Sequence, residues 1–536
     1  MNSLLRSPWA PRVAALLAGI AAGLAHPPFG FLAGVLGFGA LMRLGDTEGA
    51  RPLRSAALRG WLAGLGYFAV SVWWVTEAFM VDAATYGWMA PFALVLLAGG
   101  LALFWAAALT AYRAVGVRGL PGVAVFAGAV AGMEWLRGHV LTGFPWNLPG
   151  ELWPAGSPPS QAAAVIGVYG LSWITLVIGG CLGLLWSPGS WRYRGVGALI
   201  GLAALGGLFA YGSDRLGPSV PAAGGPVVRI VQANVDQKEK WRPENLDSLV
   251  EAYASLTRRP AARTPDVVVW PEGALPAVID DLVAPGSPYL WRLTAMLKPG
   301  QTLMMGANRA GLSRSGAAGE FDYFNSLVAF RREEDGLRVS GVYDKHKLVP
   351  FGEFVPLGDL AGRIGLRSLV HMPEDFTAGP EPAPIQADGL PRVQPLICYE
   401  ALFPELTRGA MRARNGPAQW LLNVSNDAWF GVTSGPHQHL NIARYRAIES
   451  GLPMVRSTPT GISAIIDPYG RIVAGASLRQ GAFGVIDAPL PAALATPPYV
   501  SLGDMPFALM VAASALAGLA GRGANRGRLQ DIKKSL

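Results

Sequence analysis

The chain has 536 residues, of which 51% are hydrophobic and 15% are charged, and its mean hydropathy of +0.32 is too high for an ordinary soluble enzyme. Two cysteines exclude a disulfide-stapled scaffold, and no CxxC motif or Cys/His spacing indicates a zinc site. The net charge of +8 does not indicate nucleic-acid binding, because Arg and Lys cluster beside apolar stretches without a basic patch that carries interleaved aromatics.

Eight apolar stretches are candidates for membrane spans, since crossing the hydrocarbon core takes about 20 apolar residues. They lie near 10–25, 29–42, 57–80, 89–112, 119–136, 162–186, 195–212 and 503–521. The first two are short, and the prolines of HPPFG between them exclude one continuous helix, which leaves a tight pair of spans or a re-entrant hairpin. The sequence thus predicts a membrane bundle of about eight helices, with seven in residues 1–212 and one at 503–521.

Arginine and lysine in the short loops predict the orientation of this bundle. They precede the first span, follow the second, fourth and sixth spans, and recur in the basic tail 522–536, so alternating spans place them all on one side. That side is the cytoplasm, and the segment between the seventh and eighth spans is then outside the membrane, on the opposite side. If the first span were a cleaved signal peptide, the other spans would keep this orientation. The outer loop 137–161 is either a plain connector with interfacial aromatics or a floor or lateral gate beneath the outer domain.

Residues 225–495 have the composition of a globular domain and a different periodicity. Apolar runs typical of strands, several of them buried on both faces, are interspersed with helical patterns, which predicts an α/β layered domain. The strands are expected at 227–235, 266–272, 302–308, 323–330, 337–349, 393–400, 419–427 and 461–473, and the helices near 243–258, 286–297, 402–413 and 437–450.

Several of these strands end in polar residues, which is where α/β domains place their sites. WPEG carries Glu272, YDKHKLVPFGE carries Lys345 and Glu353, and PLICYE carries Cys398 and Glu400. A carboxylate that accepts the thiol proton, with an ammonium nearby, would make the cysteine a nucleophile, and the ammonium could also hold an oxyanion. Taken singly, the cysteine also fits a core position, Glu272 a turn cap and Lys345 a solvated strand position.

The segments WPEGALP, YDKHKLVPFGEFVP and ICYEALFP, in this order, resemble the signatures of the nitrilase or carbon-nitrogen hydrolase superfamily, whose members use a Glu, Lys, Cys triad. With seven spans before this domain and one after it, nearly the whole chain resembles the apolipoprotein N-acyltransferase family of the bacterial inner membrane. The resemblance implies an αββα sandwich for the periplasmic domain 225–495.

The resemblance also implies roles for individual residues. Glu272 matches the general base, Lys345 the oxyanion-stabilising lysine and Cys398 the nucleophile. Supporting or binding positions are matched by Glu353, Tyr399, Glu400, Trp241 and Asn325.

The implied reaction is a two-step acyl transfer that needs no metal or other cofactor. An acyl chain from the sn-1 position of a phospholipid would form a thioester on Cys398 and then pass to the α-amine of the S-diacylglyceryl cysteine of an apolipoprotein. Both partners are membrane-anchored, since extracting an acyl chain costs about 0.8 kcal/mol per CH₂. The alternatives are a membrane-tethered amidase or nitrilase acting on a small amide, and a non-enzymatic transporter or receptor, although the spans carry few ionisable residues.

Three further features have weaker chemical interpretations. His346 points opposite to Lys345 if the segment is extended, which disfavours it as the base. His437 and His439 do not share a helix face and lack an evident third ligand, so we expect a surface or capping role for them and not a metal site. The segment NVSNDAWFG (423–431) either shapes the pocket near the cysteine or forms an ordinary turn.

Overall fold

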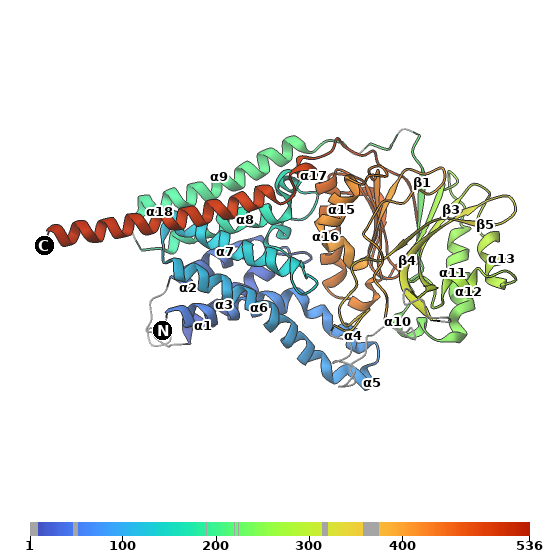
Figure 1. The fold of residues 1–536 in the computed structure, drawn as a ribbon, viewed down its shortest axis with the longest axis horizontal. Coiled ribbons are helices and arrows are strands. Elements are labelled where there is room, and N and C mark those ends of the chain that lie inside the picture. Colours follow the sequence, from blue (N-terminus) through green and yellow to red (C-terminus); the bar gives the residue numbers. More distant parts are fainter. Residues whose placement is uncertain are drawn as a thin grey trace. The chain divides into compact units, whose positions relative to one another are not determined.

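The computed structural model describes residues 9–46, 52–188, 190–218, 220–222, 224–313, 320–356 and 375–535. The chain divides into two compact units, one formed by Met1–Gly217 with Ser501–Leu536 and the other by Pro218–Val500. Figure 1 shows that the first consists of helices and that the second contains the strands.

The helical unit contains the predicted apolar helices. Six helical stretches of the described chain are long and apolar enough to cross a membrane, and two shorter apolar helices, Ala10–Gly23 and Leu32–Gly45, precede them. All eight predicted stretches are therefore helical, although the first two are shorter than a span requires. The six long stretches are Pro52–Met80, Ala83–Val115, Gly119–His139, Pro159–Trp186, Trp191–Arg215 and Met505–Gly523.

Small residues allow the helices of this unit to pack closely. Helix α3 (Pro52–Val72) packs against α1 (Ala10–Gly23) and α6 (Ala90–Val115), and α18 (Met505–Ser535) packs against α7 (Gly119–His139) (Figure 1). A Cβ atom on Gly19 of α1 would lie 1.8 Å from the carbonyl oxygen of Ala63 in α3, and one on Gly60 of α3 would lie 2.4 Å from that of Trp105 in α6. Glycine at these crossings is therefore a packing requirement, as is common between membrane helices.

A buried ion pair at the end of α7 holds the segment that follows it. Glu134 and Arg137 are both fully buried and form an ion pair, and the indole nitrogen of Trp105 donates to the Glu134 carboxylate at 2.8 Å. Arg137 also donates to the backbone oxygens of Phe144 and, at 3.2 Å, Trp146. The indole of Trp146 is buried, and its ring lies 4.6 Å from that of Trp74, so the start of the loop 137–161 packs on helical residues of its own unit.

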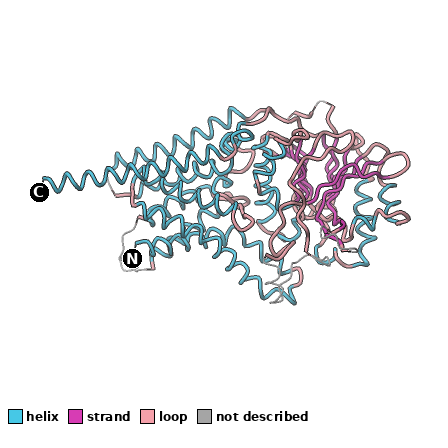
Figure 2. Tube along the Cα trace, viewed as in Figure 1, coloured by secondary structure: helices cyan, strands magenta, loops and turns pink. Residues whose placement is uncertain are grey.

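The second unit consists of two β-sheets stacked between helices, and it confirms the predicted αββα sandwich (Figure 2). The six-stranded sheet has the order β11-β1-β2-β3-β4-β5, and the five-stranded sheet has the order β10-β9-β8-β7-β6. The strands are β1 Val227–Gln232, β2 Val267–Trp270, β3 Thr302–Leu312, β4 Phe321–Arg332, β5 Leu337–Asp344, β6 Val393–Ile397, β7 Trp420–Val424, β8 Met454–Ser457, β9 Ser463–Ile466, β10 Ile472–Leu478 and β11 Gly484–Pro489.

The core explains why these segments form central strands. Strands β1 and β2 are parallel, as are β6, β7 and β8, and all five are buried along their length, which is typical of parallel strands covered on both faces. Apolar side chains from the two sheets meet in one cluster, and the outer face of the six-stranded sheet packs against α11 (Leu246–Thr257) and α13 (Pro288–Ala295). The second unit also contains α15 (Pro404–Met411) and the longer helix α16 (Gly435–Ser450).

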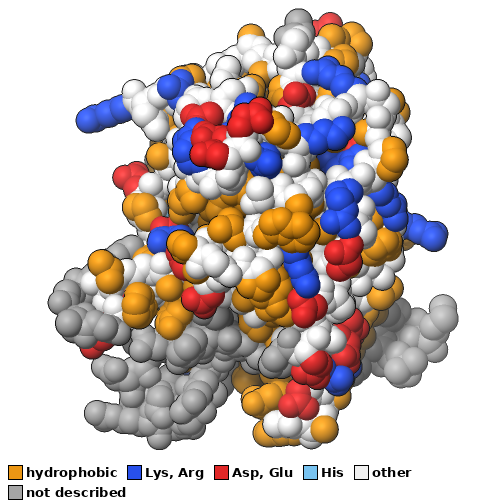
Figure 3. All heavy atoms as spheres, turned by 90° about the vertical axis from the view of Figure 1, so that its right-hand side faces the viewer, with side chains coloured by type: hydrophobic (Ala, Val, Ile, Leu, Met, Phe, Trp, Pro, Cys, Tyr) orange, Lys and Arg blue, Asp and Glu red, His pale blue; other side chains and the backbone are white. Residues whose placement is uncertain are grey.

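Charged side chains of both signs mix on the face of this unit that carries α11 and α13 (Figure 3). Two ion pairs there are exposed, Arg258 with Glu251 and Arg292 with Asp247. Exposed pairs of this kind contribute about 0–1 kcal/mol each to stability, so they indicate a water-facing surface more than a stabilising device.

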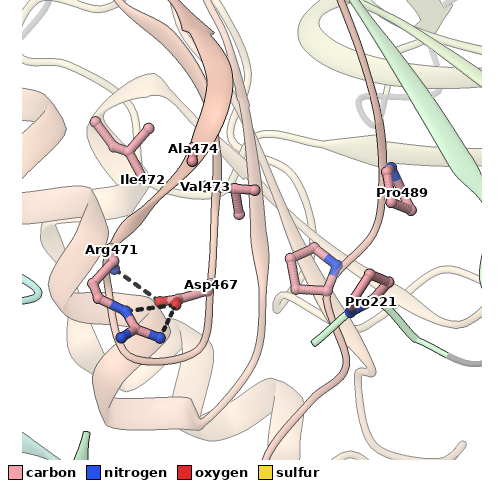
Figure 4. A pocket seen from close by; sticks show the side chains of 8 residues that line it. Pro221, Asp467, Arg471, Ile472, Val473, Ala474 and Pro489 are labelled. Carbon is pink, nitrogen blue, oxygen red and sulfur yellow. Dashed lines mark hydrogen bonds and ion pairs between the residues drawn. The ribbon is translucent and has the colours of Figure 1, made fainter. Parts of the chain in front are cut away.

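The structure contains two strands and one turn that the sequence pattern did not predict. The segment 461–473, predicted as one strand, contains strand β9, a turn and the start of β10, because the Asp467 carboxylate accepts backbone hydrogen bonds from Tyr469 and Arg471 and closes the turn. Strands β8 and β11 were not predicted. Beside the turn lies an open pocket lined by residues that include Pro221, Arg471 and Pro489 (Figure 4), and none of the predicted site residues lines it.

Candidate active site

Cys398 directly follows the buried strand β6 and begins a short 3-10 turn, Cys398–Leu402. Its φ angle of +50° lies in the left-handed region, which residues other than glycine rarely adopt. Such strained backbone is concentrated at functional sites, where the surrounding structure enforces it. Cys398 is half-buried, and the ring nitrogen Nε2 of His439 lies 3.2 Å from its carbonyl oxygen.

Glu272 lies in the turn after β2, and three donors hold its carboxylate. Oε1 accepts hydrogen bonds from Asn325 Nδ2 at 2.7 Å and from Lys345 Nζ at 3.3 Å, and Oε2 accepts one from the backbone N–H of Asn426 at 2.6 Å. The side chain is buried. The carboxylate therefore has a single defined position, set by residues from β4, from the end of β5 and from the loop after β7.

Lys345 follows β5 and is completely buried between two carboxylates. Its Nζ lies 2.9 Å from Glu353 Oε1, in addition to its contact with Glu272, and Asn325 Nδ2 also donates to Glu353 Oε1 at 2.7 Å. Burial lowers the pKa of the ammonium, but Glu272 and Glu353 more than offset this effect, so its pKa is raised above the usual value. Lys345 is accordingly charged at neutral pH.

The charges of Glu272 and Lys345 both act on the Cys398 thiol, with opposite signs. Burial raises the pKa of the thiol and the Glu272 carboxylate raises it further, whereas Lys345 and a hydrogen bond with Ser425 lower it. The net effect is an increase. In the free protein the sulfur is therefore a thiol at neutral pH, and a base must take its proton when it reacts.

Glu400 joins the two loops that carry Lys345 and Cys398. Its carboxylate is fully buried and accepts hydrogen bonds from the Tyr343 hydroxyl at 2.9 Å, from the backbone N–H of His346 at 2.8 Å and from that of Ile397 at 2.8 Å. Burial raises the pKa of Glu400, and the backbone donors oppose that effect. These contacts join the end of β5 to the end of β6.

The other predicted residues lie around this centre. Tyr399 is buried with its ring edge-on to Phe403, 5.1 Å between centroids. Trp241 is half-buried after the short helix α10 (Gln237–Lys240), and the Lys240 ammonium lies 5.5 Å from its ring centroid. His346 Nδ1 lies 3.1 Å from the carbonyl oxygen of Gly379, so a backbone group occupies this nitrogen.

Of the two histidines 437 and 439, only the first lies at the surface, which corrects the expected surface position of the second. His437 is exposed, but His439 is buried, with Nδ1 3.0 Å from Asp427 Oδ1 and Nε2 facing Cys398. Asp427 also accepts from Arg456 Nη2 at 2.7 Å, and this guanidinium is the main reason that the carboxyl pKa is lowered although burial raises it. In the part of the chain that the structure covers, no three His, Cys, Asp or Glu side chains form a group suited to a metal ion.

The segment 423–431 therefore shapes the site. Ser425 Oγ donates to Asp427 at 2.7 Å, and the next residue, Asn426, donates its backbone N–H to Glu272. The buried network of Asp427, His439 and Arg456 fixes this loop. The sequence offered two partial signals for it, the polar NVSND run at the end of a buried strand and the HQH motif, but Arg456 lies on β8, one of the two strands that the sequence pattern did not predict.

Comparison with known proteins assigns both parts of the chain to families. The family model "Carbon-nitrogen hydrolase" matches residues 227–497, and the model "Apolipoprotein N-acyltransferase N-terminal domain" matches residues 18–181. A protein from Caulobacter vibrioides named apolipoprotein N-acyltransferase is 52% identical over 94% of this chain and 93% of its own length. Proteins of the same name are 37% identical in Brucella melitensis, covering 91% of each chain, and 36% identical in Bradyrhizobium diazoefficiens, covering 97% and 96%. The chain belongs to the apolipoprotein N-acyltransferase family.

Proposed function

We propose that this multi-pass membrane protein transfers the sn-1 acyl chain of a phospholipid to the α-amine of the S-diacylglyceryl cysteine of an apolipoprotein. The observation that carries the proposal is a strained cysteine beside a buried Glu–Lys–Glu network, in a chain whose other unit contains six helical stretches long and apolar enough to cross a bilayer. Family membership and the names of the relatives support the choice of substrates. The reaction is the last step of lipoprotein maturation in the inner membrane.

In the first step, Glu272 takes the proton of Cys398 as the sulfur attacks the ester carbonyl. The raised pKa of the thiol makes this proton transfer part of the reaction and not a pre-equilibrium. Lys345 Nζ and the backbone N–H of Tyr399 stabilise the oxyanion, and each such donor typically lowers the barrier by about 2.7–4 kcal/mol. The carbon–oxygen bond then breaks, the proton on Glu272 passes to the departing lysophospholipid oxygen, and a thioester remains.

In the second step, the α-amine of the acceptor attacks the thioester carbonyl. Glu272 accepts the proton of the amine, Lys345 again faces the oxyanion, and the carbon–sulfur bond breaks to regenerate Cys398, which recovers a proton from Glu272. Glu353 and Asn325 hold the Lys345 and Glu272 side chains in place through both steps. An acceptor and an acyl chain that exclude water would slow hydrolysis of the thioester.

The test is formation of an acyl adduct. The full-length protein in detergent is incubated with a phospholipid labelled in its sn-1 chain, and we expect an alkali-labile adduct in the wild type and in Cys181→Ala, but not in Cys398→Ala. The Cys181→Ala variant is the matched control, because it removes the other cysteine of the chain. No adduct in the wild type, or an adduct that survives in Cys398→Ala, would contradict the proposal.

A second stage separates acyl transfer from hydrolysis. When a diacylated lipopeptide is added to the labelled adduct, the label should move to the peptide amine, and an N-acetylated form of the same lipopeptide should not accept it. Release of free fatty acid at the same rate with both peptides would instead support a membrane-tethered hydrolase.

A further inference from the structure

Lys240 is a second buried lysine beside the catalytic carboxylate. It is the last residue of α10 (Figure 1), and its side chain is 4% exposed. Its ammonium makes no hydrogen bond or ion pair with any residue that the structure describes, in contrast to Lys345, which contacts two carboxylates. Among the described residues the ammonium of this buried side chain contacts the ring of Trp241 but no carboxylate, whereas buried charges are normally paired with an opposite charge.

The ammonium lies against the turn that carries Glu272. A Cβ atom built on Gly273, the residue after the catalytic carboxylate, would be 3.3 Å from Lys240 Nζ. Attraction to Glu272 raises the pKa of Lys240, but burial has the larger effect, and the pKa is lowered to about 8. At neutral pH the ammonium is therefore mostly charged, and an anion that approached it would gain a poorly solvated partner.

Two contacts fix α10 and its lysine in this position. Gln237 Oε1 accepts a hydrogen bond at 3.2 Å from the side chain of Asn426, the residue whose backbone N–H holds Glu272. The ring of Trp241 lies 5.5 Å from Lys240 Nζ, which is within the range of a cation–π contact. The cation is thus held in place before any substrate binds, and binding does not have to order it.

We propose that Lys240 binds the anionic phosphate of the acyl donor. The inference rests on the proposed function, in which the donor is a phospholipid whose phosphate and sn-1 ester are attached to opposite ends of the same glycerol. The Lys240 ammonium lies beside Gly273, the residue after Glu272, and is suited to hold the phosphate while the ester faces Cys398. The phosphate then pairs the Lys240 charge, and the lysophospholipid that leaves in the first step carries it away.

The experiment compares two donors that carry the same labelled sn-1 chain, a phosphatidylethanolamine and a phosphate-free diacylglycerol. Adduct formation on Cys398 is followed in the full-length protein without acceptor. The wild type should use the phospholipid at a lower half-saturating concentration than the diacylglycerol. In Lys240→Met that concentration should rise about tenfold for the phospholipid, as expected for loss of a hydrogen bond between charged groups, and remain unchanged for the diacylglycerol.

The same helix provides the matched control. Lys238 is exposed, two residues before Lys240, and Lys238→Met should leave both donors unaffected. Lys240→Arg, which keeps the charge, should retain most of the preference for the phospholipid. If Lys240→Met does not fold, Lys240→Gln is used in its place.

Three results would overturn the inference. Equal slowing with both donors would show that Lys240 acts through the charge of Glu272 and not on the phosphate. Unchanged kinetics in Lys240→Met, or a wild type that does not distinguish the donors, would also exclude phosphate recognition by this lysine. Absence of any adduct from either donor in the wild type is a different outcome, because it contradicts the proposed function itself.

Discussion

Lys345 illustrates how the candidate site places a full charge where water is excluded. Its buried ammonium is stabilised by Glu272 and Glu353, which are themselves held by Asn325. Removing one partner of a buried ion pair typically costs about 3–5 kcal/mol. Replacement of Lys345 would therefore combine loss of stability with loss of activity, and Glu272 is the more informative residue to change because glutamine preserves its shape.

We predict that Glu272→Gln lowers the pKa of Cys398 and at the same time abolishes most of the acyl transfer. The carboxylate raises the pKa of the thiol, and the Lys345 charge, which lowers it, remains in the variant. At a given pH, iodoacetamide should therefore alkylate Cys398 faster than in the wild type, whereas loss of the general base should slow adduct formation by about 10²–10⁴-fold.

The measurement is the pH dependence of alkylation in a Cys181→Ala background, in which Cys398 is the remaining cysteine. The alkylation profile should shift to lower pH in Glu272→Gln. An unchanged profile, or a shift to higher pH, would contradict the arrangement of charges around the sulfur. Cys398→Ala in the same background gives the rate of non-specific labelling.

At the scale of elements, the position of Glu272 depends on a close contact between its turn and the neighbouring strand β3. Gly306 of β3 carries no side chain, and a Cβ atom there would lie 2.4 Å from Glu272 Cα and 2.6 Å from the carbonyl oxygen of Pro271. Both contacts are with backbone, so no side-chain rotation relieves them. The backbone N–H of Ala274 donates to the Gly306 carbonyl at 3.0 Å and holds the turn on the strand.

We predict that Gly306→Ala displaces Glu272 and lowers both stability and activity. Overpacking of this kind typically costs about 1–3 kcal/mol, and a shift of the carboxylate relative to Cys398 should reduce adduct formation further. Thermal unfolding and the adduct assay measure the two effects. Gly336→Ala is the control, because nothing lies within 4 Å of its Cβ position in the turn between β4 and β5. Equal behaviour of the two variants would show that the close contact does not position the base.

At the scale of the whole molecule, the arginine-rich loops of the helical unit predict that the domain of residues 218–500 faces the periplasm. Val432 of this domain is 91% exposed, and Arg54, in the first turn of α3, is exposed as well. These two positions suit a labelling experiment in a chain that lacks both native cysteines.

We expect a membrane-impermeant maleimide to label Val432→Cys in intact spheroplasts and to label Arg54→Cys only after the membrane is permeabilised. The reason is that positively charged loops are retained on the cytoplasmic side. Labelling of both variants after permeabilisation is the control for reactivity. The opposite pattern in intact spheroplasts would invert the orientation and place the thiol chemistry in the cytoplasm.

The hydrophobic patterns of the sequence determined the types of the elements and several of their functional ends. Runs such as those before Glu272 and Cys398 form buried strands because their side chains can be covered on both faces, and polar residues after them mark strand ends. The motifs around Glu272, Lys345 and Cys398 then indicated the family. These are local properties, since each depends on residues that are close together in the chain.

The tertiary structure alone decided which polar groups meet. Glu400 contacts the backbone of His346 because the ends of β5 and β6 come together, and Arg456 reaches Asp427 because β8 lies beside β7. Lys240 is a lysine in a polar helix by its sequence, and only the fold places it, without a hydrogen-bond or ion-pair partner among the described residues, at the turn of Glu272. Such contacts join residues far apart in the chain, and they depend on strand order and packing, which local periodicity does not encode.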